Sequence, residues 1–318
     1  MIKESIYSFT SGYRGEFEVN AYRFGKGKKS VCIVGAMRGN EIQQLYICSK
    51  LVKALGELEK QCRISFDHEI TVVPCVNPFS MNVGKRFWSE DDRDINRDFP
   101  GNAAGEPTQR IAAELLDKIS GYQYGIQFAS FYIGGDFVPH VRIMGDLESI
   151  PESVDLAASV FGLPYVVLRK PISFEKTTLN YNWQLRGTQA FSLYTNETER
   201  IDEKSALLAV SAVLRFMSEM GMGIIKHPCH RGFISTIFEE DGLVAVKSAT
   251  GGIFRKIKKP GDNVAQGELM AEILHPYENT VLEEIKAPCN GVVFFAHNTP
   301  LAAESLVIYR VIKGSLMN

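Results

Sequence analysis

Asn96 and Arg97 are adjacent residues whose side chains could together hold a carboxylate. A guanidinium group donates parallel hydrogen bonds in a fixed fork, and a neighbouring carboxamide adds a donor, so the pair orients a carboxylate better than a lysine does. A second interpretation is also open, because Asp94 and Asp98 flank the pair and either could form an ion pair with Arg97. The first interpretation predicts a binding site for a small carboxylate, and the second predicts a loop held by its own charges.

These residues belong to a long polar segment, residues 77–101, that carries a fixed pattern. An Asn-Pro pair is followed by Gly-x-Arg-Phe and then by Asp-x-Asn-Arg-x-Phe-Pro-Gly. The matching residues are Asn77, Pro78, Gly84, Arg86, Phe87, Asp94, Asn96, Arg97, Phe99, Pro100 and Gly101. With this spacing the segment resembles the signature of the succinylglutamate desuccinylase and aspartoacylase family of zinc-carboxypeptidase-like deacylases.

The resemblance implies a hydrolase of amide or ester bonds in small acylated amino compounds. In that chemistry zinc polarises the carbonyl group and lowers the pKa of its bound water, while a glutamate transfers the proton and arginines hold the substrate carboxylate. By the same resemblance, Arg86, Asn96 and Arg97 are the substrate-binding residues.

The positions that the resemblance assigns to zinc ligands are altered in this chain. The His-x-x-Glu pair of the family corresponds to Arg38 and Glu41, and its third ligand, a histidine, corresponds to Gln127. Glu41 keeps the carboxylate, but an arginine stays protonated and repels a cation. The neutral amide of Gln127 is a poor zinc ligand. We therefore expect zinc, the family's cofactor, to be absent or weakly bound here.

Arg38 could take over part of the role of the metal. Paired with Glu41 inside the vacated metal cavity, its guanidinium supplies a fixed positive charge that could polarise a carbonyl oxygen or hold an anion. Alternatively, it only neutralises a carboxylate that would be costly to bury. The general-base glutamate of the family corresponds to Tyr194, and a shift of three residues would offer Glu197 instead.

Two functions are compatible with these residues. The first is a deacylase that captures metal through Glu41 and unexpected partners, or works without metal through Arg38 and either Tyr194 or Glu197. The second is a catalytically inactive relative that keeps the arginine-rich pocket and binds a carboxylate-bearing small ligand. A separate group, His227-Pro-Cys229-His230, could contribute to a metal site or be an ordinary linker.

The elements that must position these residues alternate between strands and helices. A β-branched run at residues 29–36 leads into residues 40–55, whose apolar residues recur at helical spacing, and a second apolar run precedes the polar segment. Strands are expected over residues 29–36, 70–76, 124–130, 139–144 and 191–195, and helices over 40–55, 108–119 and 203–220. This order predicts an α/β fold with a mixed sheet flanked by helices, as in the zinc carboxypeptidases.

The helical periodicity ends near residue 232, after which short β runs alternate with turns. We predict domains at residues 1–231 and 232–318, the second a small all-β domain. Its weak internal repeat resembles the barrel-sandwich fold of biotinyl and lipoyl carrier domains. The hairpin tip that would present a modifiable lysine is residues 275–279, His-Pro-Tyr-Glu-Asn, so a carrier role is not expected.

The charge composition of the chain indicates which classes of binding partner to expect. The net charge is −2 and basic residues are scattered, which gives no footprint for nucleic acid or an anionic membrane. A small-molecule carboxylate is the expected partner, and a homo-oligomer is possible. The first residues have no basic and apolar leader pattern, and the six cysteines form no CxxC pair, so reduced thiols in the cytoplasm are expected.

Overall fold

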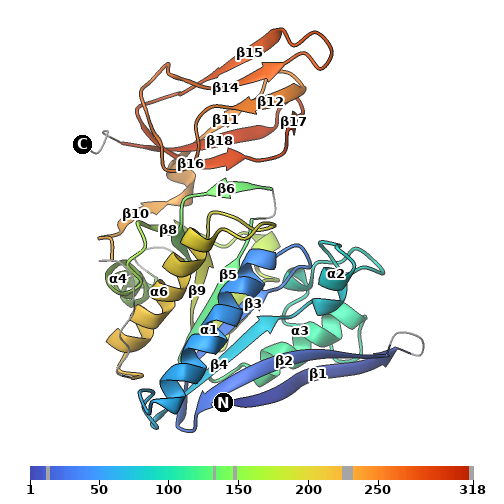
Figure 1. Cartoon of the computed structure of the whole chain (residues 1–318), viewed down its shortest axis with the longest axis vertical. Helices are drawn as coiled ribbons and strands as arrows, with labels where there is room; N and C mark the ends of the chain where they lie inside the picture. The colour runs from blue at the N-terminus through green and yellow to red at the C-terminus, as the bar shows by residue number, and fades with distance from the viewer. Residues whose placement is uncertain (12–14, 132–133, 146–148, 224–231, 315–318) are drawn as a thin grey trace. The chain divides into compact units, whose positions relative to one another are not determined.

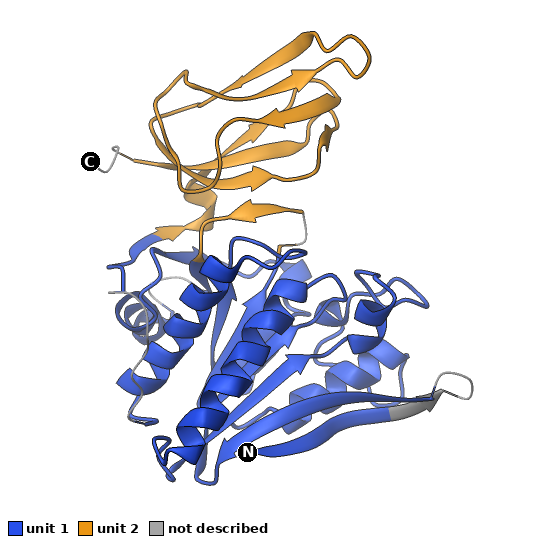
Figure 2. Ribbon diagram, in the orientation of Figure 1, with its two compact units in different colours: residues 1–130, 140–237 blue, residues 131–139, 238–318 orange. Residues whose placement is uncertain are grey.

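The computed structural model describes residues 1–11, 15–131, 134–145, 149–223 and 232–314. The chain divides into two compact units, one of residues 1–130 and 140–237 and the other of residues 131–139 and 238–318 (Figure 2). The second unit therefore includes a short segment taken from the middle of the first. Every residue predicted for the site belongs to the first unit.

The first unit is built on a nine-stranded mixed sheet with the order β1-β2-β4-β3-β5-β9-β7-β8-β10 (Figure 1). Strands β4, β3, β5 and β9 run parallel, β7 is antiparallel to β9, and β1 and β2 form an antiparallel hairpin at one edge. The bounds are β1 Ile2–Ser11, β2 Gly15–Gly25, β3 Lys28–Ala36, β4 His68–Cys75, β5 Tyr124–Ala129, β7 His140–Met144, β8 Tyr165–Arg169, β9 Gln189–Tyr194 and β10 Thr236–Glu239. The predicted mixed α/β fold is confirmed.

Helices cover both faces of this sheet because its central strands are apolar on both sides. In β3, Val31 and Ile33 pack into one core with α1 and α6, whereas Cys32 and Val34 pack into a second core with α3 and α5. The helices are α1 Ile42–Lys60, α2 Pro78–Asn82, α3 Pro107–Lys118, α4 Pro151–Val160, α5 Leu179–Leu185 and α6 Glu203–Glu219, with short 3₁₀ turns η1 Ile95–Arg97 and η2 Ser173–Glu175.

The predicted helices and strands are present to within a few residues, and several elements were not predicted. The long polar segment contains α2 and η1, and the first 25 residues contribute the β1–β2 hairpin. Elements α4, β8 and α5 also lacked a clear pattern. Their residues are short amphipathic runs that acquire regular structure by packing on the large sheet.

The second unit contains two antiparallel sheets around its own core. One has the order β11-β18-β16-β13 with β6 added beside β16, and the other has the order β15-β14-β12-β17. The bounds are β6 Gly135–Phe137, β11 Leu243–Lys247, β12 Gly252–Lys256, β13 Asn263–Val264, β14 Leu269–Leu274, β15 Val281–Lys286, β16 Gly291–His297, β17 Leu301–Ala302 and β18 Val307–Lys313, with a 3₁₀ turn η3 at Glu240–Gly242. The expected all-β sheets are present.

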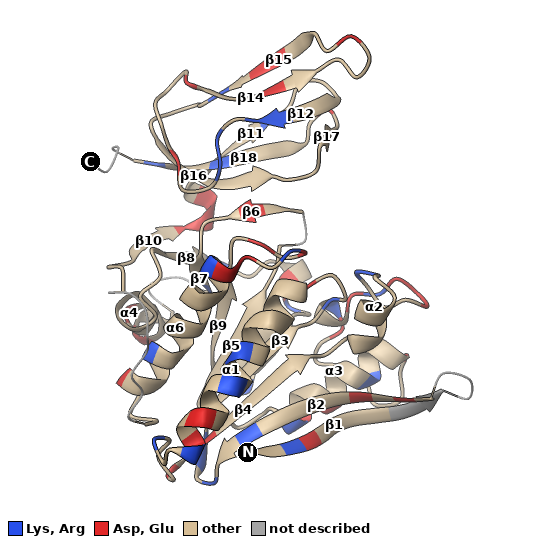
Figure 3. Ribbon diagram, in the orientation of Figure 1, with Lys and Arg blue, Asp and Glu red and all other residues tan. Residues whose placement is uncertain are grey.

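Acidic and basic side chains are interspersed along the ribbons of both units (Figure 3). Among the helices of the described residues, none is long and apolar enough to cross a bilayer.

Candidate anion-binding site

Arg38 and Glu41 lie in the short connection between β3 and α1. The backbone turns there because the Glu41 carboxylate accepts hydrogen bonds from two amides of the connection, Met37 N at 2.7 Å and Arg38 N at 3.0 Å. Glu41 thereby occupies the N-cap position of α1, where a negative charge is favoured by the helix dipole. Sequence and local structure together fix this carboxylate at the carboxyl end of β3.

The Arg38 guanidinium is buried and paired on both sides. Its Nη1 donates to Glu41 Oε1 at 3.1 Å, while Nη2 and Nε donate to Asp94 Oδ2 at 2.8 and 3.1 Å. The Arg38 and Glu41 side chains are only 3% and 1% exposed, and that of Asp94 is 7% exposed. Burial opposes the charge, but the neighbouring Asp94 and Glu41 carboxylates outweigh it and raise the pKa of Arg38 above its usual value.

Ser130 completes this cluster from the end of β5. Its hydroxyl donates to Glu41 Oε1 and accepts from Arg38 Nη1 at 3.2 Å. The Glu41 carboxylate thus receives two amides, one hydroxyl and one guanidinium. These four donors fix the position of the carboxylate.

Asp94 links this cluster to the Asn96-Arg97 pair. Its second oxygen, Oδ1, accepts the Asn96 amide at 3.1 Å and caps η1. The other flanking carboxylate, Asp98, is paired with Arg93 at 2.6 Å. The Arg97 amide donates to the Asp94 carbonyl oxygen at 2.7 Å, but among the described contacts neither carboxylate is paired with the Arg97 guanidinium.

Arg97 is surrounded differently from Arg38. Its guanidinium carbon lies 3.9 Å from the centroid of the Phe174 ring, and Nη1 makes a long 3.5 Å hydrogen bond to the Phe174 carbonyl oxygen. The buried Nε has no hydrogen-bond partner among the described residues. Burial, with the positive charges of Arg38 and Arg142, lowers the pKa of Arg97, while Asp94 and Tyr194 act in the opposite direction.

The Asn96 carboxamide is hydrogen-bonded through its oxygen only, among the described hydrogen bonds. The oxygen, Oδ1, accepts the Leu179 amide at the start of α5 at 3.1 Å, and the residue is 8% exposed. The Nδ2 group has no acceptor among the described hydrogen bonds. Arg97 Nε and Asn96 Nδ2 are therefore donors without a hydrogen-bond partner among the described residues.

Tyr194 interacts electrostatically with Arg97 and is fixed by two neighbours on β7. His140 pairs with Tyr194 across β7 and β9, and the two rings stack with centroids 4.6 Å apart. The Arg142 guanidinium carbon lies 4.9 Å from the Tyr194 ring centroid. Tyr194 is 3% exposed, so its ring is a rigid wall of the site.

No hydrogen bond or ring contact described here joins the other predicted site residues to Arg38 or Arg97. Gln127 is buried within β5, paired in register with Val34 and Ser192. Glu197 follows the end of β9, and its backbone oxygen accepts the Thr195 hydroxyl at 3.0 Å. Arg86 holds Gly39 through its backbone oxygen at 2.8 Å, while its guanidinium lies over the Phe87 ring. The roles predicted for these residues stay predictions.

Sequence reasoning did not identify Ser130, Arg142 or Asp94 as site residues. Asp94 stands in the motif and Arg142 in the stretch Pro139-His-Val-Arg142, so both had a sequence signal. Ser130 had none, because only the parallel pairing of β3 with β5 brings it beside Glu41.

The donor set around Glu41 does not fit zinc. Structural and catalytic zinc sites use at least three histidine, cysteine or carboxylate ligands. Within the described ranges, no three such side chains gather in a way that could hold a metal ion. Instead, the Arg38 guanidinium donates a hydrogen bond to Glu41 Oε1. The His227 to His230 group lies outside the described residues.

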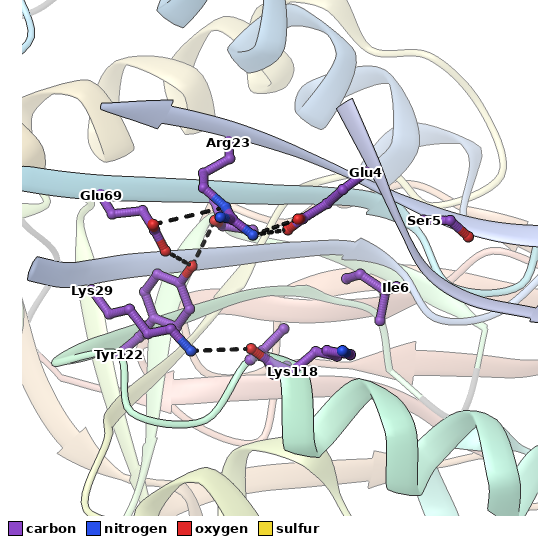
Figure 4. A pocket seen from close by; sticks show the side chains of 10 residues that line it. Glu4, Ser5, Ile6, Arg23, Lys29, Glu69, Lys118 and Tyr122 are labelled. Carbon is purple, nitrogen blue, oxygen red and sulfur yellow. Dashed lines mark hydrogen bonds and ion pairs between the residues drawn. The ribbon is translucent and has the colours of Figure 1, made fainter. Parts of the chain in front are cut away.

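A second polar cluster lies at the opposite end of β3, around a cavity of about 210 Å³ (Figure 4). Arg23 is paired with Glu4 and lies 3.8 Å from Glu69, and the Tyr122 hydroxyl donates to Glu69 at 2.6 Å. Lys29 Nζ donates to the Ser120 carbonyl oxygen at 3.2 Å. Burial raises the pKa of Tyr122. These groups satisfy one another, which is the arrangement of a structural network.

The fold and the motif agree with comparison to known proteins. Residues 27–220 match the succinylglutamate desuccinylase/aspartoacylase catalytic domain, and the chain belongs to this family. Its members are deacylases of small acylated amino acids and are typically zinc-dependent. The predicted family is thus confirmed.

Individual relatives are distant in sequence and close in fold. The N-alpha-acetyl-L-2,4-diaminobutyric acid deacetylase of Halomonas elongata is 24% identical over 155 residues, which cover 47% of this chain and 42% of the relative. A succinylglutamate desuccinylase/aspartoacylase from Rhodobacter sphaeroides superposes with a TM-score of 0.79 at 19% identity, covering 97% of this chain and 95% of that one. The product-bound ectoine utilization protein EutE (DoeB) from Ruegeria pomeroyi gives 0.78 at 19% identity, covering 98% and 93%.

Proposed function

We propose that this chain is a metal-independent member of its family that binds a small ligand through a carboxylate group. The contacts are the Arg97 guanidinium and Asn96 Nδ2. The observation that carries the proposal is the state of Arg97, whose buried Nε has no partner among the described residues and whose neighbours Arg38 and Arg142 add positive charge. An anion bound there satisfies donors and relieves repulsion between cations.

The Arg38 cluster supports binding rather than catalysis. Glu41 is saturated by four donors, and Arg38 donates from all three nitrogens to Glu41, Asp94 and Ser130. Neither group has the freedom that a general base or a carbonyl-polarising cation needs. In this proposal the cluster is a structural centre that holds η1, and with it Asn96 and Arg97, at the carboxyl ends of the strands.

Metal-free hydrolysis of an amide or ester bond in a small acylated amino compound is the second candidate. It is supported by family membership and by the position of Tyr194 beside Arg97 and Arg142. Tyr194 or Glu197 would then handle the proton and Arg38 the developing charge, as the sequence suggested.

The decisive experiment compares acetate binding with turnover in the intact protein. Sodium acetate should raise the melting temperature above that in sodium chloride of equal ionic strength, because a ligand that binds only the folded state stabilises it. The Arg97→Gln variant should lose the effect. Arg93→Gln is the matched control, since Arg93 lies in the same loop but is paired with Asp98.

Turnover decides between the two candidates. Purified protein incubated with N-acetyl-L-2,4-diaminobutyrate should release no acetate, and its zinc content by elemental analysis should be far below one ion per chain. Steady acetate release that is lost in Tyr194→Phe would establish the hydrolase. Equal stabilisation by acetate and chloride would remove the binding proposal.

We propose that the C-terminal domain, predicted from residue 232, is a barrel-sandwich related to biotinyl and lipoyl domains, which its two antiparallel sheets around one core support. We also propose a cytoplasmic protein that does not bind nucleic acid or membranes and could form homo-oligomers. The interspersed charges support the absence of a nucleic-acid surface (Figure 3).

A further inference from the structure

The segment after β8 forms a rigid support next to Arg97. Glu175 in η2 is 4% exposed, accepts the Ile172 amide at 3.2 Å and is paired with Arg169 at 2.5 Å. The Thr177 carbonyl oxygen accepts the Phe99 amide at 3.1 Å. These bonds attach the segment both to β8 and to the loop that carries Asn96 and Arg97.

Two large apolar residues of this anchored segment are exposed. Ile172 is 54% and Phe174 is 52% exposed, whereas the neighbouring Glu175 is buried. Exposed apolar surface costs roughly 25 cal/mol per Å² relative to burial. Their backbone is anchored, so these two side chains stay exposed next to Arg97. We call Ile172 and Phe174 the apolar lip.

The apolar lip is continuous with the proposed carboxylate site. The Arg97 guanidinium carbon lies over the Phe174 ring, 3.9 Å from its centroid, and the Phe174 carbonyl oxygen accepts a hydrogen bond from Arg97 Nη1. Stacking uses the face of the guanidinium and leaves its edge for in-plane hydrogen bonds to a carboxylate. A ligand bound at that edge therefore has the lip next to it.

We propose that the apolar lip receives the hydrocarbon part of the ligand whose carboxylate binds Arg97, so that the ligand class is small amphipathic monocarboxylates. This inference rests on the proposed function. The rival is a ligand with a second carboxylate, because Lys170 and Lys176 flank the lip and are both exposed.

Acetate, hexanoate and adipate distinguish these classes. Hexanoate and adipate have the same chain length and differ in the second carboxylate, while acetate reports the carboxylate site alone. Isothermal titration of the intact protein should give hexanoate roughly tenfold tighter binding than acetate, which corresponds to covering about two methylene groups. Adipate should bind more weakly than hexanoate.

Phe174 variants attribute the preference to the lip. Phe174→Ser should reduce the hexanoate advantage to about threefold or less, whereas Phe174→Leu, which keeps apolar surface but removes the aromatic ring, should retain most of it. Adipate binding as tight as hexanoate, or an unchanged preference in Phe174→Ser, overturns the inference while leaving the carboxylate site intact. A change in sedimentation of Phe174→Ser overturns it in favour of a contact between copies of the chain.

Failure of the proposed function gives a different result. In that case none of the three anions binds, or all bind equally to wild type and to Arg97→Gln. Either outcome contradicts both the carboxylate site at Arg97 and the inference about the apolar lip.

Discussion

Arg38 and Arg97 are two arginines of one site that the fold treats in opposite ways. Arg38 lies between two carboxylates and donates from every nitrogen, and its pKa is raised. Arg97 is stacked on an aromatic ring beside other cations, keeps a buried Nε without a described partner, and has a lowered pKa. Identical side chains thus serve as an internal counter-charge in one place and, in our proposal, as an anion receptor in the other.

This difference in hydrogen-bond partners indicates which arginine could bind a ligand. The resemblance places Arg38 at a metal-ligand position and so favoured Arg38 as the functional arginine. The hydrogen bonds of the two side chains favour Arg97 as the one that binds a ligand. A buried donor without a partner costs free energy that a ligand can recover, and a saturated donor offers nothing to a ligand.

The largest expected effect comes from removing the charge of Arg38. Arg38→Gln leaves Glu41 and Asp94 buried without their counter-charge, and we expect a loss of about 3–5 kcal/mol in the free energy of unfolding. Urea unfolding followed by circular dichroism measures this loss.

The matched control for that variant is Arg97→Gln. Because burial and neighbouring cations lower the pKa of Arg97, the folded state disfavours its charge throughout the neutral pH range. With solvent screening, the neutral variant should change stability by less than about 1 kcal/mol at neutral pH. Equal losses in both variants would contradict the comparison.

Arg38→His tests whether the cluster is a metal site blocked by a guanidinium. An imidazole at this position, with Glu41 and Asp94 on either side, provides three potential ligands. We expect zinc to raise the melting temperature of this variant and EDTA to reverse the effect, with no such response in wild type. Wild-type protein that retains one zinc ion through purification contradicts the expectation.

Tyr122→Phe probes the closed network at the other end of β3 (Figure 4). The variant removes the hydroxyl that donates to Glu69 and is hydrogen-bonded to Thr71 at 2.7 Å. A loss of about 1–2 kcal/mol is expected, because the partly buried Glu69 carboxylate loses a donor. Acetate affinity should be unchanged, and a parallel fall in affinity would show that the two ends of β3 are coupled.

The smallest effect is a pH dependence at His68. Burial, with the nearby Lys28, lowers the pKa of His68, whose Nδ1 is 2.7 Å from the Ser30 hydroxyl. The neutral ring therefore stabilises the fold above its unfolded pKa, and the contribution is lost as pH falls through the lowered folded pKa. The melting temperature should fall slightly between about pH 7.5 and about pH 5.5, and less so in His68→Asn. An identical pH profile for both proteins would exclude His68 as the cause.

The family and the mixed α/β fold could both be predicted from the sequence alone. Eleven motif residues between Asn77 and Gly101 stand at fixed offsets, and the apolar runs of β3, β4 and β5 are long enough to identify strands without tertiary context. An arginine at position 38 excludes a ligand there in any fold, because its charge is a property of the side chain. The ion pair between Arg38 and Glu41 was also predicted, because the resemblance assigns both residues to one metal cavity.

Tertiary structure decided which arginine is paired and which remains available. Asp94 could bond Arg97, its neighbour in sequence, or Arg38, fifty-six residues away, and only the packing of η1 against the end of β3 selects Arg38. Ser130 and Phe174 reach the site from β5 and from the segment after β8, which no local pattern connects to residue 97. Hydrogen bonds and ring contacts act over a few ångströms in space, so their partners are set by strand order and loop packing and not by distance along the chain.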